Sequence, residues 1–213
     1  MSTCTDPTHN HGEHSHTATP AAEEPVIQVK MHDTPNPDSK KYVFAGRNLL
    51  PGGSANFTDV AEATVNSPMA KRLFTVTGVK GVFIGHNFIT LSRESAVEWS
   101  TLNASLAPVL EAFFDSGEPV LNSMAKADIP LLDDMDTSSE INQKIKALVD
   151  EKVRPSVAEH GGDIVFRGFK DGIVYLEMHG ACGSCPSSTY TLKEGVESML
   201  RYHCDEVKEV RAL

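Results

Sequence analysis

The chain has few cysteines, few aromatic residues and no long hydrophobic run. Its 213 residues include 4 cysteines, 1 tryptophan and 7% aromatic residues in total. Four cysteines are too few for a small fold held together by disulfides, and no stretch approaches the ~18 consecutive apolar residues of a membrane span. Acidic residues outnumber lysine and arginine by 29 to 19, and no basic stripe stands out. The composition therefore argues against a disulfide scaffold, a membrane-spanning protein and a nucleic-acid-binding protein.

Targeting signals and catalytic motifs are also missing. The N-terminal residues contain neither the apolar core of a signal peptide nor an arginine-rich transit segment. We therefore expect a bacterial-type cytoplasmic protein, or a mature mitochondrial-matrix form whose targeting segment has been removed. The chain has no phosphate-binding loop and no evident Ser/His/Asp set, so we expect no enzymatic activity.

Two cysteines three positions apart, Cys182 and Cys185, are the most informative feature of the chain. The run before them, Ile173–Met178, is rich in β-branched and aromatic residues and predicts a strand. The run after them has apolar residues at helical spacing, with Ser187 or Ser188 as the expected N-cap. The cysteines thus lie at the entrance of a helix, where unpaired N–H groups favour thiolates. Paired thiolates suit iron, zinc or a redox partner.

Two thiolates cannot complete a four-coordinate soft metal site. Four-cysteine ligation is the rule for iron–sulfur clusters, so this pair supplies half a site. The other half has to come from a second copy of the chain, from small thiols or from elsewhere in the sequence. One alternative is a zinc-stabilised interaction module in which His203 and Cys204 complete the set. The other interpretation of Cys204 is a small buried hydrophobic residue at a helix end, which we favour.

The pattern along the chain predicts two small α+β domains joined by a linker. Residues 26–116 form the first domain, 117–138 the linker and 139–213 the second domain. Residues 1–25 predict a disordered tail, because they cannot bury a core. The tail contains a cysteine and four histidines whose spacing could bind metal, although a polar solvated tail is the simpler interpretation: Cys4, His9, His11, His14 and His16.

The expected elements of the first domain are short. Strands are predicted near 26–31, 41–44, 79–84 and 88–91, the last two joined by a hairpin turn at Gly85-His86-Asn87. Residues 50–54 are expected to be loop. Ser67 and Pro68 predict the N-cap and first residue of a helix, and a longer amphipathic helix is predicted from Ser95 to Phe114.

The second domain is expected to have the order αββαβ. A helix with an apolar face from Ile141 to Val157 is expected to end at Gly161-Gly162. A hairpin of 163–169 and 173–178, turning at Lys170-Asp171-Gly172, leads into the CxxC loop, its helix and a final strand at 207–212.

Two histidines flank the cysteine loop in the sequence. His160 is expected to be a helix C-terminal residue that interacts with exposed carbonyls, and not a ligand. Two interpretations of His179 remain open. It could lie next to the cysteine ligands and tune the potential or the solvent access of a bound cluster, or it could be an exposed loop histidine.

Each predicted domain carries its own set of sequence motifs. The second domain has two, Glu159-His160-Gly161-Gly162-Asp163 and Gly180-Ala181-Cys182-Gly183-Ser184-Cys185-Pro186-Ser187-Ser188-Thr189. The first domain carries an independent set, Thr34-Pro35-Asn36-Pro37, Ser67-Pro68-Met69-Ala70, Gly78-Val79, Phe83-Ile84-Gly85, Phe88-Ile89-Thr90-Leu91 and Trp99. With these motifs both domains resemble the Nfu family of NifU-like iron–sulfur scaffold proteins. Two unrelated motif sets in the expected order are more specific than CxxC alone.

The resemblance implies a carrier of a [4Fe–4S] cluster, with [2Fe–2S] as the other possible cargo. It implies a homodimer in which Cys182 and Cys185 of both copies hold the cluster. It also implies upstream cluster-assembly proteins as donors and apo-enzymes, such as those of lipoyl synthesis, as recipients. The first domain is expected to contribute partner contacts and no ligands.

Overall fold

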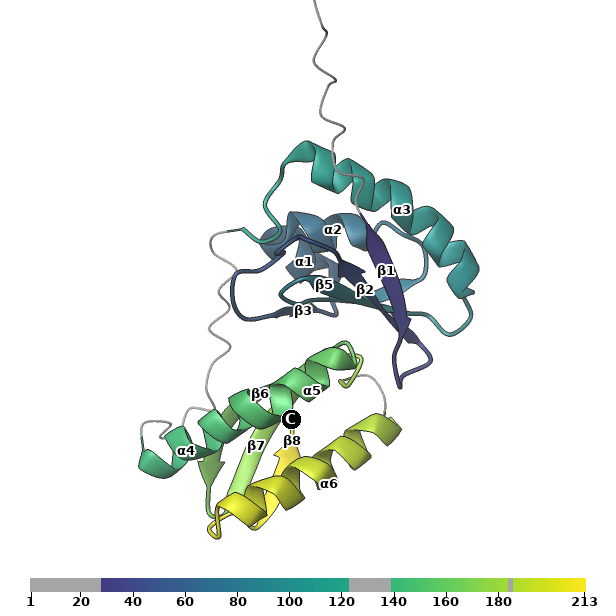
Figure 1. The fold of residues 1–213 in the computed structure, drawn as a ribbon. Helices are drawn as coiled ribbons and strands as arrows, with labels where there is room; N and C mark the ends of the chain where they lie inside the picture. Colours follow the sequence, from purple (N-terminus) through teal and green to yellow (C-terminus); the bar gives the residue numbers. More distant parts are fainter. Residues whose placement is uncertain (1–27, 123–138, 184–185) are drawn as a thin grey trace, which may run out of the picture.

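The computed structural model describes residues 28–122, 139–183 and 186–213. The histidine-rich tail predicted for 1–25, most of the linker predicted for 117–138, and Cys185 lie outside the described residues. Two small α+β domains are present, as the sequence predicts (Figure 1). Among the described residues, no helix combines the length and apolar character that crossing a bilayer requires.

The first domain is a five-stranded antiparallel sheet with three helices over one face (Figure 1). Its strands run in the order β1-β2-β5-β4-β3 and comprise β1 Val29–Asp33, β2 Ser39–Phe44, β3 Ala55–Phe57, β4 Val79–Ile84 and β5 Phe88–Arg93. Its helices are α1 Val60–Asn66, α2 Pro68–Leu73 and α3 Trp99–Ser116. Alternate strand residues, including Phe44 and Leu91, pack under these helices as the core of the domain.

Several local predictions for the first domain are confirmed. Ser67 caps α2, because its Oγ accepts from the Ala70 N–H at 3.0 Å, and Pro68 is the first helical residue. The β4–β5 hairpin turns where expected, and the Gly85 N–H donates to the Phe88 carbonyl at 2.8 Å.

The predicted pattern missed β3 and α1 and placed the start of α3 too early. Strand β3 has three residues, too few for an alternation to register. Helix α1 had a usable signal, because Asp59 caps it and Glu62 follows three positions later. Helix α3 begins at Trp99 and not at Ser95.

The second domain has the predicted αββαβ order. Its elements are α4 Glu140–Leu148, a π-helical turn η1 Val149–Val153, α5 Arg154–Glu159, β6 Gly162–Lys170, β7 Ile173–Gly180, α6 Pro186–His203 and β8 Glu209–Ala212. The π-helical turn ends two residues before Pro155, which has no N–H for the regular helical hydrogen bond. Strands β6 and β7 are antiparallel, whereas β8 lies parallel to β7 because α6 crosses over between them.

The face of the first sheet that its own helices leave open lies against the second domain. Phe83, Phe88 and Thr90 point to this face and are only 2%, 6% and 1% exposed. A methyl group built on Gly180 of β7 would lie 3.0 Å from the Phe83 ring, and one built on Gly161 would lie 2.8 Å from Thr90 Oγ1. The central strands β4 and β5 are therefore buried on both faces, and one of these faces is buried by the domain that contains Cys182.

Thr90 provides a test of this burial. Its hydroxyl is buried and has no hydrogen-bond partner among the described residues. Because a buried polar group without a partner is costly, Thr90→Val should leave the free energy of unfolding unchanged or raise it by about 1 kcal/mol. Thr90→Ser, which keeps the hydroxyl and loses the methyl group, should lower it. Urea denaturation of the full chain measures both. A large loss of stability in Thr90→Val would contradict the conclusion that the Thr90 hydroxyl is buried without a hydrogen-bond partner.

Candidate metal centre

Cys182 lies in the short connection between the end of β7 and the start of α6, where the sequence placed it. It is 7% exposed and packs at the edge of the second domain's core. Helix α6 begins at Pro186, so Ser187 and Ser188 lie within the helix and the N-cap prediction for them is wrong. Because Cys185 lies outside the described residues, its role as a ligand stays a prediction.

The sulfur of Cys182 lies against the backbone of Gly162, the first residue of β6. A Cβ atom built on Gly162 would lie 2.8 Å from Cys182 Sγ and 2.8 Å from the His179 carbonyl oxygen. Atoms this close would clash, so only glycine leaves room for the sulfur at this point. The Gly161-Gly162 pair in the sequence therefore serves the cysteine loop as well as the end of α5.

A pocket of about 620 Å³ opens beside Cys182. Residues of η1 and α5 form one wall, residues of α6 the other, and Pro35 and Asn36 of the first domain also line it. Most of the lining is apolar, including Val157, Val196 and Met199. The thiol thus borders a cavity that both domains line.

His179 is buried on strand β7 and is not an exposed loop residue. It is 7% exposed, and its Nε2 lies 2.8 Å from Glu177 Oε1. Arg167 Nε donates to the other oxygen of Glu177 at 2.7 Å. Burial raises the pKa of Glu177, but the hydrogen bonds from His179 and Arg167 outweigh it and hold the pKa below its usual range. The Nδ1 atom of His179 has no hydrogen-bond partner among the described residues.

The His160 prediction is right about position, and the contact with the helix-end carbonyls is made by its backbone N–H, which donates to the Val157 carbonyl at 3.1 Å. His160 is the C-cap of α5 and is exposed. The cation that reaches the carbonyls at this helix end is Lys41 of β2, whose Nζ donates to the carbonyls of Ala158 at 2.7 Å and Glu159 at 3.4 Å. Sequence reasoning missed Lys41, because its partner lies in the other domain.

Asp163 is a second ionic contact next to the cysteine loop. Arg154 of α5 donates to both of its oxygens, at 2.8 and 2.7 Å, and Ser54 of the first domain donates to Oδ2 at 2.6 Å. Burial raises the pKa of Asp163, but these hydrogen bonds and the positive charge of Arg154 together lower it below its usual range. Asp163 therefore stays ionised and joins the two domains.

The structure does not bring together the described members of the zinc alternative, Cys182, His203 and Cys204. Cys204 is 1% exposed in the core beside Leu200 and Val207, as the favoured interpretation predicted. Cys182, His203 and Cys204 all belong to the part of the chain that is described. Within that part, no three His, Cys, Asp or Glu side chains are gathered closely enough to hold a metal ion.

Family models match most of the chain in two segments. Residues 27–117 match the model described as "Scaffold protein Nfu/NifU N terminal", and residues 145–211 match the model described as "NifU-like domain". The match to the solution structure of a NifU-like protein from Saccharomyces cerevisiae covers 53% of this chain and 99% of the yeast chain, with 23% sequence identity and a TM-score of 0.42.

Curated relatives align over nearly the whole chain. A Drosophila erecta protein named "NFU1 iron-sulfur cluster scaffold homolog, mitochondrial" is 44% identical over 194 residues, which is 90% of this chain. The Drosophila sechellia protein of the same name is 46% identical over 185 residues, or 85% of this chain. The aligned part spans 66% and 63% of the length of these relatives.

The contact between Gly162 and Cys182 gives a prediction with an internal control. Gly162→Ala should lower the free energy of unfolding by about 1–3 kcal/mol, because the new methyl group meets a backbone oxygen and the sulfur. Gly195→Ala should raise it by roughly 1 kcal/mol, since Gly195 lies inside α6 with nothing within 4 Å of its Cβ position. Urea denaturation measures both. Equal effects of the two substitutions would contradict the described packing.

The Asp163 contact predicts a dependence of stability on pH. A carboxyl group whose folded pKa is lowered stabilises the fold above its unfolded pKa, about 3.8, and that contribution is lost as pH falls through the folded value. Asp163→Asn should therefore be less stable at pH 7, and its difference from the wild type should shrink between about pH 5 and pH 2. Denaturant titrations across this range measure the difference. The exposed Asp115→Asn is the control, and a constant gap for Asp163→Asn would refute the assignment.

Proposed function

The chain belongs to the Nfu family of NifU-like scaffold proteins, and from this membership we propose that it holds an iron–sulfur cluster and passes it to other proteins. The observation that carries the proposal is the location of Cys182, a thiol beside a pocket in the connection between β7 and α6. The sequence supplies a second thiol, Cys185, three positions later. Soft thiolates are the ligands that iron–sulfur clusters take in proteins.

One chain supplies half of the ligand set. A cluster takes four thiolates as a rule, and Cys204 is buried in the core away from the pocket. We infer that two copies of the chain each contribute Cys182 and Cys185 to one [4Fe–4S] cluster, which then bridges a homodimer. A [2Fe–2S] cluster would use the same four thiolates, and the family resemblance favours the four-iron form.

Release follows from the same ligand set. A cysteine thiolate of a recipient forms a bond to iron while the bond from Cys182 or Cys185 breaks, and the oxidation state of the cluster does not change. Four such exchanges move the cluster from the dimer to the recipient. The chain then acts as a scaffold between upstream assembly proteins and apo-proteins of the lipoyl-synthesis type, and not as an enzyme.

The relatives support one of the two expected cellular locations. The curated relatives are named as mitochondrial proteins, which supports the mitochondrial form of the two expected locations. The bacterial cytoplasmic expectation has no support from them. We propose the mitochondrial matrix, the compartment in which a reduced thiol pair and cluster recipients would meet.

Substitution of the two loop cysteines tests the bridging cluster. After anaerobic incubation with iron and sulfide, the wild type should appear in native mass spectrometry as a dimer carrying one four-iron cluster. Cys182→Ala or Cys185→Ala should abolish both the cluster and the cluster-dependent dimer, because each removes two of the four thiolates from the bridged site.

Cys204→Ala is the matched control and should retain the cluster and the dimer. Iron bound to a persistent dimer of either loop variant would contradict the proposal. A wild-type monomer carrying one zinc ion would contradict it as well.

A further inference from the structure

Two asparagines of the first domain hydrogen-bond to the backbone immediately before Cys182. Asn36 Nδ2 donates to the Ala181 carbonyl oxygen at 3.3 Å. Asn56 Oδ1 accepts from the Gly180 N–H at 3.3 Å. One asparagine therefore acts as a donor and the other as an acceptor, on consecutive residues of the segment that leads to the cysteine.

The orientation of the Asn36 side chain is set within its own turn. Its Oδ1 accepts from the Asp38 N–H at 3.0 Å, and an N–H group can only donate. The amide nitrogen is therefore the atom that faces Ala181. With 5% of its surface exposed, Asn36 has little room for another arrangement.

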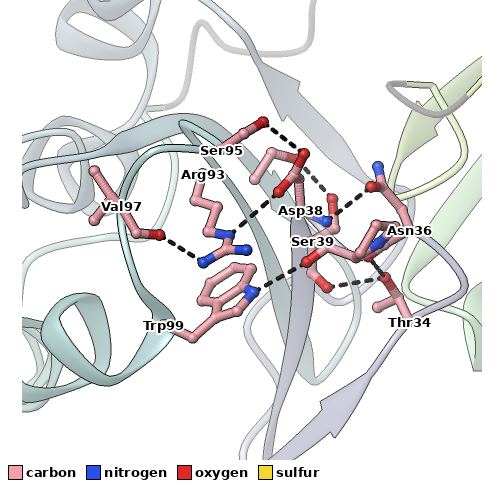
Figure 2. A network of polar contacts seen from close by, with 10 residues as sticks. Thr34, Asn36, Asp38, Ser39, Arg93, Ser95, Val97 and Trp99 are labelled. Atoms are coloured by element: carbon pink, nitrogen blue, oxygen red, sulfur yellow. Dashed lines mark hydrogen bonds and ion pairs between the residues drawn. The ribbon is translucent and has the colours of Figure 1, made fainter.

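A network of polar contacts holds this turn in the first domain (Figure 2). Asp38 accepts from Arg93 Nε at 3.3 Å and from Ser95 Oγ at 2.8 Å. Trp99 Nε1 donates to the Pro37 carbonyl at 3.1 Å, so the indole supports the turn from the start of α3. The turn and its supports include the Thr34-Pro35-Asn36-Pro37 segment and Trp99, residues on which the family resemblance rests.

The backbone that the two asparagines contact is at the end of the regular strand pairing. Gly180 is the last residue of β7 that pairs with β6, and its φ of 65° turns the chain out of the strand direction. Its close approach to Phe83 of β4 leaves no space for a side chain. The cysteine that follows two residues later is therefore attached to a segment whose course depends on the first domain.

We propose that Asn36 and Asn56 are positioning residues that hold the cluster-ligating loop from the first domain. This inference rests on the proposed function, because the value of a fixed Cys182 lies in its bond to a cluster. The first domain provides no ligand, yet it sets where one ligand lies. Loss of either hydrogen bond should free the backbone next to Cys182 and make the bound cluster easier to remove.

The same substitution should impair the loop at Asn36 and leave it unchanged at Asn56. Asn36→Asp keeps the acceptor for the Asp38 N–H but places a carboxylate oxygen against the Ala181 carbonyl, so this contact is lost. Asn56→Asp keeps the acceptor for the Gly180 N–H and strengthens it with charge. Each variant adds one negative charge near the loop, so charge alone cannot separate them.

Two measurements on the full chain read the effect. The first measurement follows, by visible absorbance, the loss of the cluster from the reconstituted protein to an iron chelator. This loss should be about three- to tenfold faster for Asn36→Asp than for the wild type, because the free energy of one hydrogen bond typically corresponds to a factor of this size. Asn56→Asp should match the wild type. Amide hydrogen exchange in the cluster-free chain should be faster at residues 180–183 for Asn36→Asp alone.

Ser54→Ala is a control that distinguishes the positioning of the loop by Asn36 and Asn56 from a general weakening of the contact between the two domains. It removes the hydrogen bond between the domains at Asp163 and touches neither Gly180 nor Ala181. It should behave as the wild type in both measurements. The proposal is overturned if the two aspartate variants behave alike, or if Ser54→Ala is impaired as strongly as Asn36→Asp.

Failure of the proposed function would look different. A wild-type chain that takes up no cluster would refute the scaffold proposal, whereas hydrogen exchange in the cluster-free chain would still decide whether Asn36 holds the loop. Equal exchange at residues 180–183 in both aspartate variants would overturn the positioning role even if the wild type binds a cluster.

Discussion

The close approach of two glycine backbones, where β6 begins and β7 ends, is the constraint on which the cysteine loop depends. Gly162 leaves room for the sulfur of Cys182, and Gly180 leaves room for Phe83 of the other domain. Side chains at these positions would push the sulfur, the strand ends and the two domains apart. Cys182 can therefore be buried and close to the first domain at the same time.

The first sheet has an unusual place in this arrangement because both faces of its central strands, β4 and β5, are covered. Its helices cover one face, and the end of the second domain that carries Cys182 covers the other. Polar contacts also join the two domains, with Lys41 at the end of α5 and Ser54 at Asp163. The first domain, whose described residues include no cysteine, thereby forms part of the surroundings of Cys182.

Much of the fold could be predicted from local patterns. The αββαβ order, the β4–β5 hairpin and the Ser67 cap depend on neighbours in sequence, which a single chain displays directly. Strand β3 was missed because three residues carry no period, and α1 was missed although Asp59 and Glu62 signalled it.

The sequence by itself determined the chemistry of the site: two soft thiolates at CxxC spacing, half of a ligand set, between a strand and a helix. Spacing and residue type are properties of the chain, and they need no knowledge of distant contacts. Only the tertiary structure decided that Cys204 belongs to the core, that His179 is buried against Glu177, and that Asn36 and Asn56 reach the backbone before Cys182. Asn36 and Ala181 are 145 residues apart, and a hydrogen bond across such a separation exists only once both domains have folded and met.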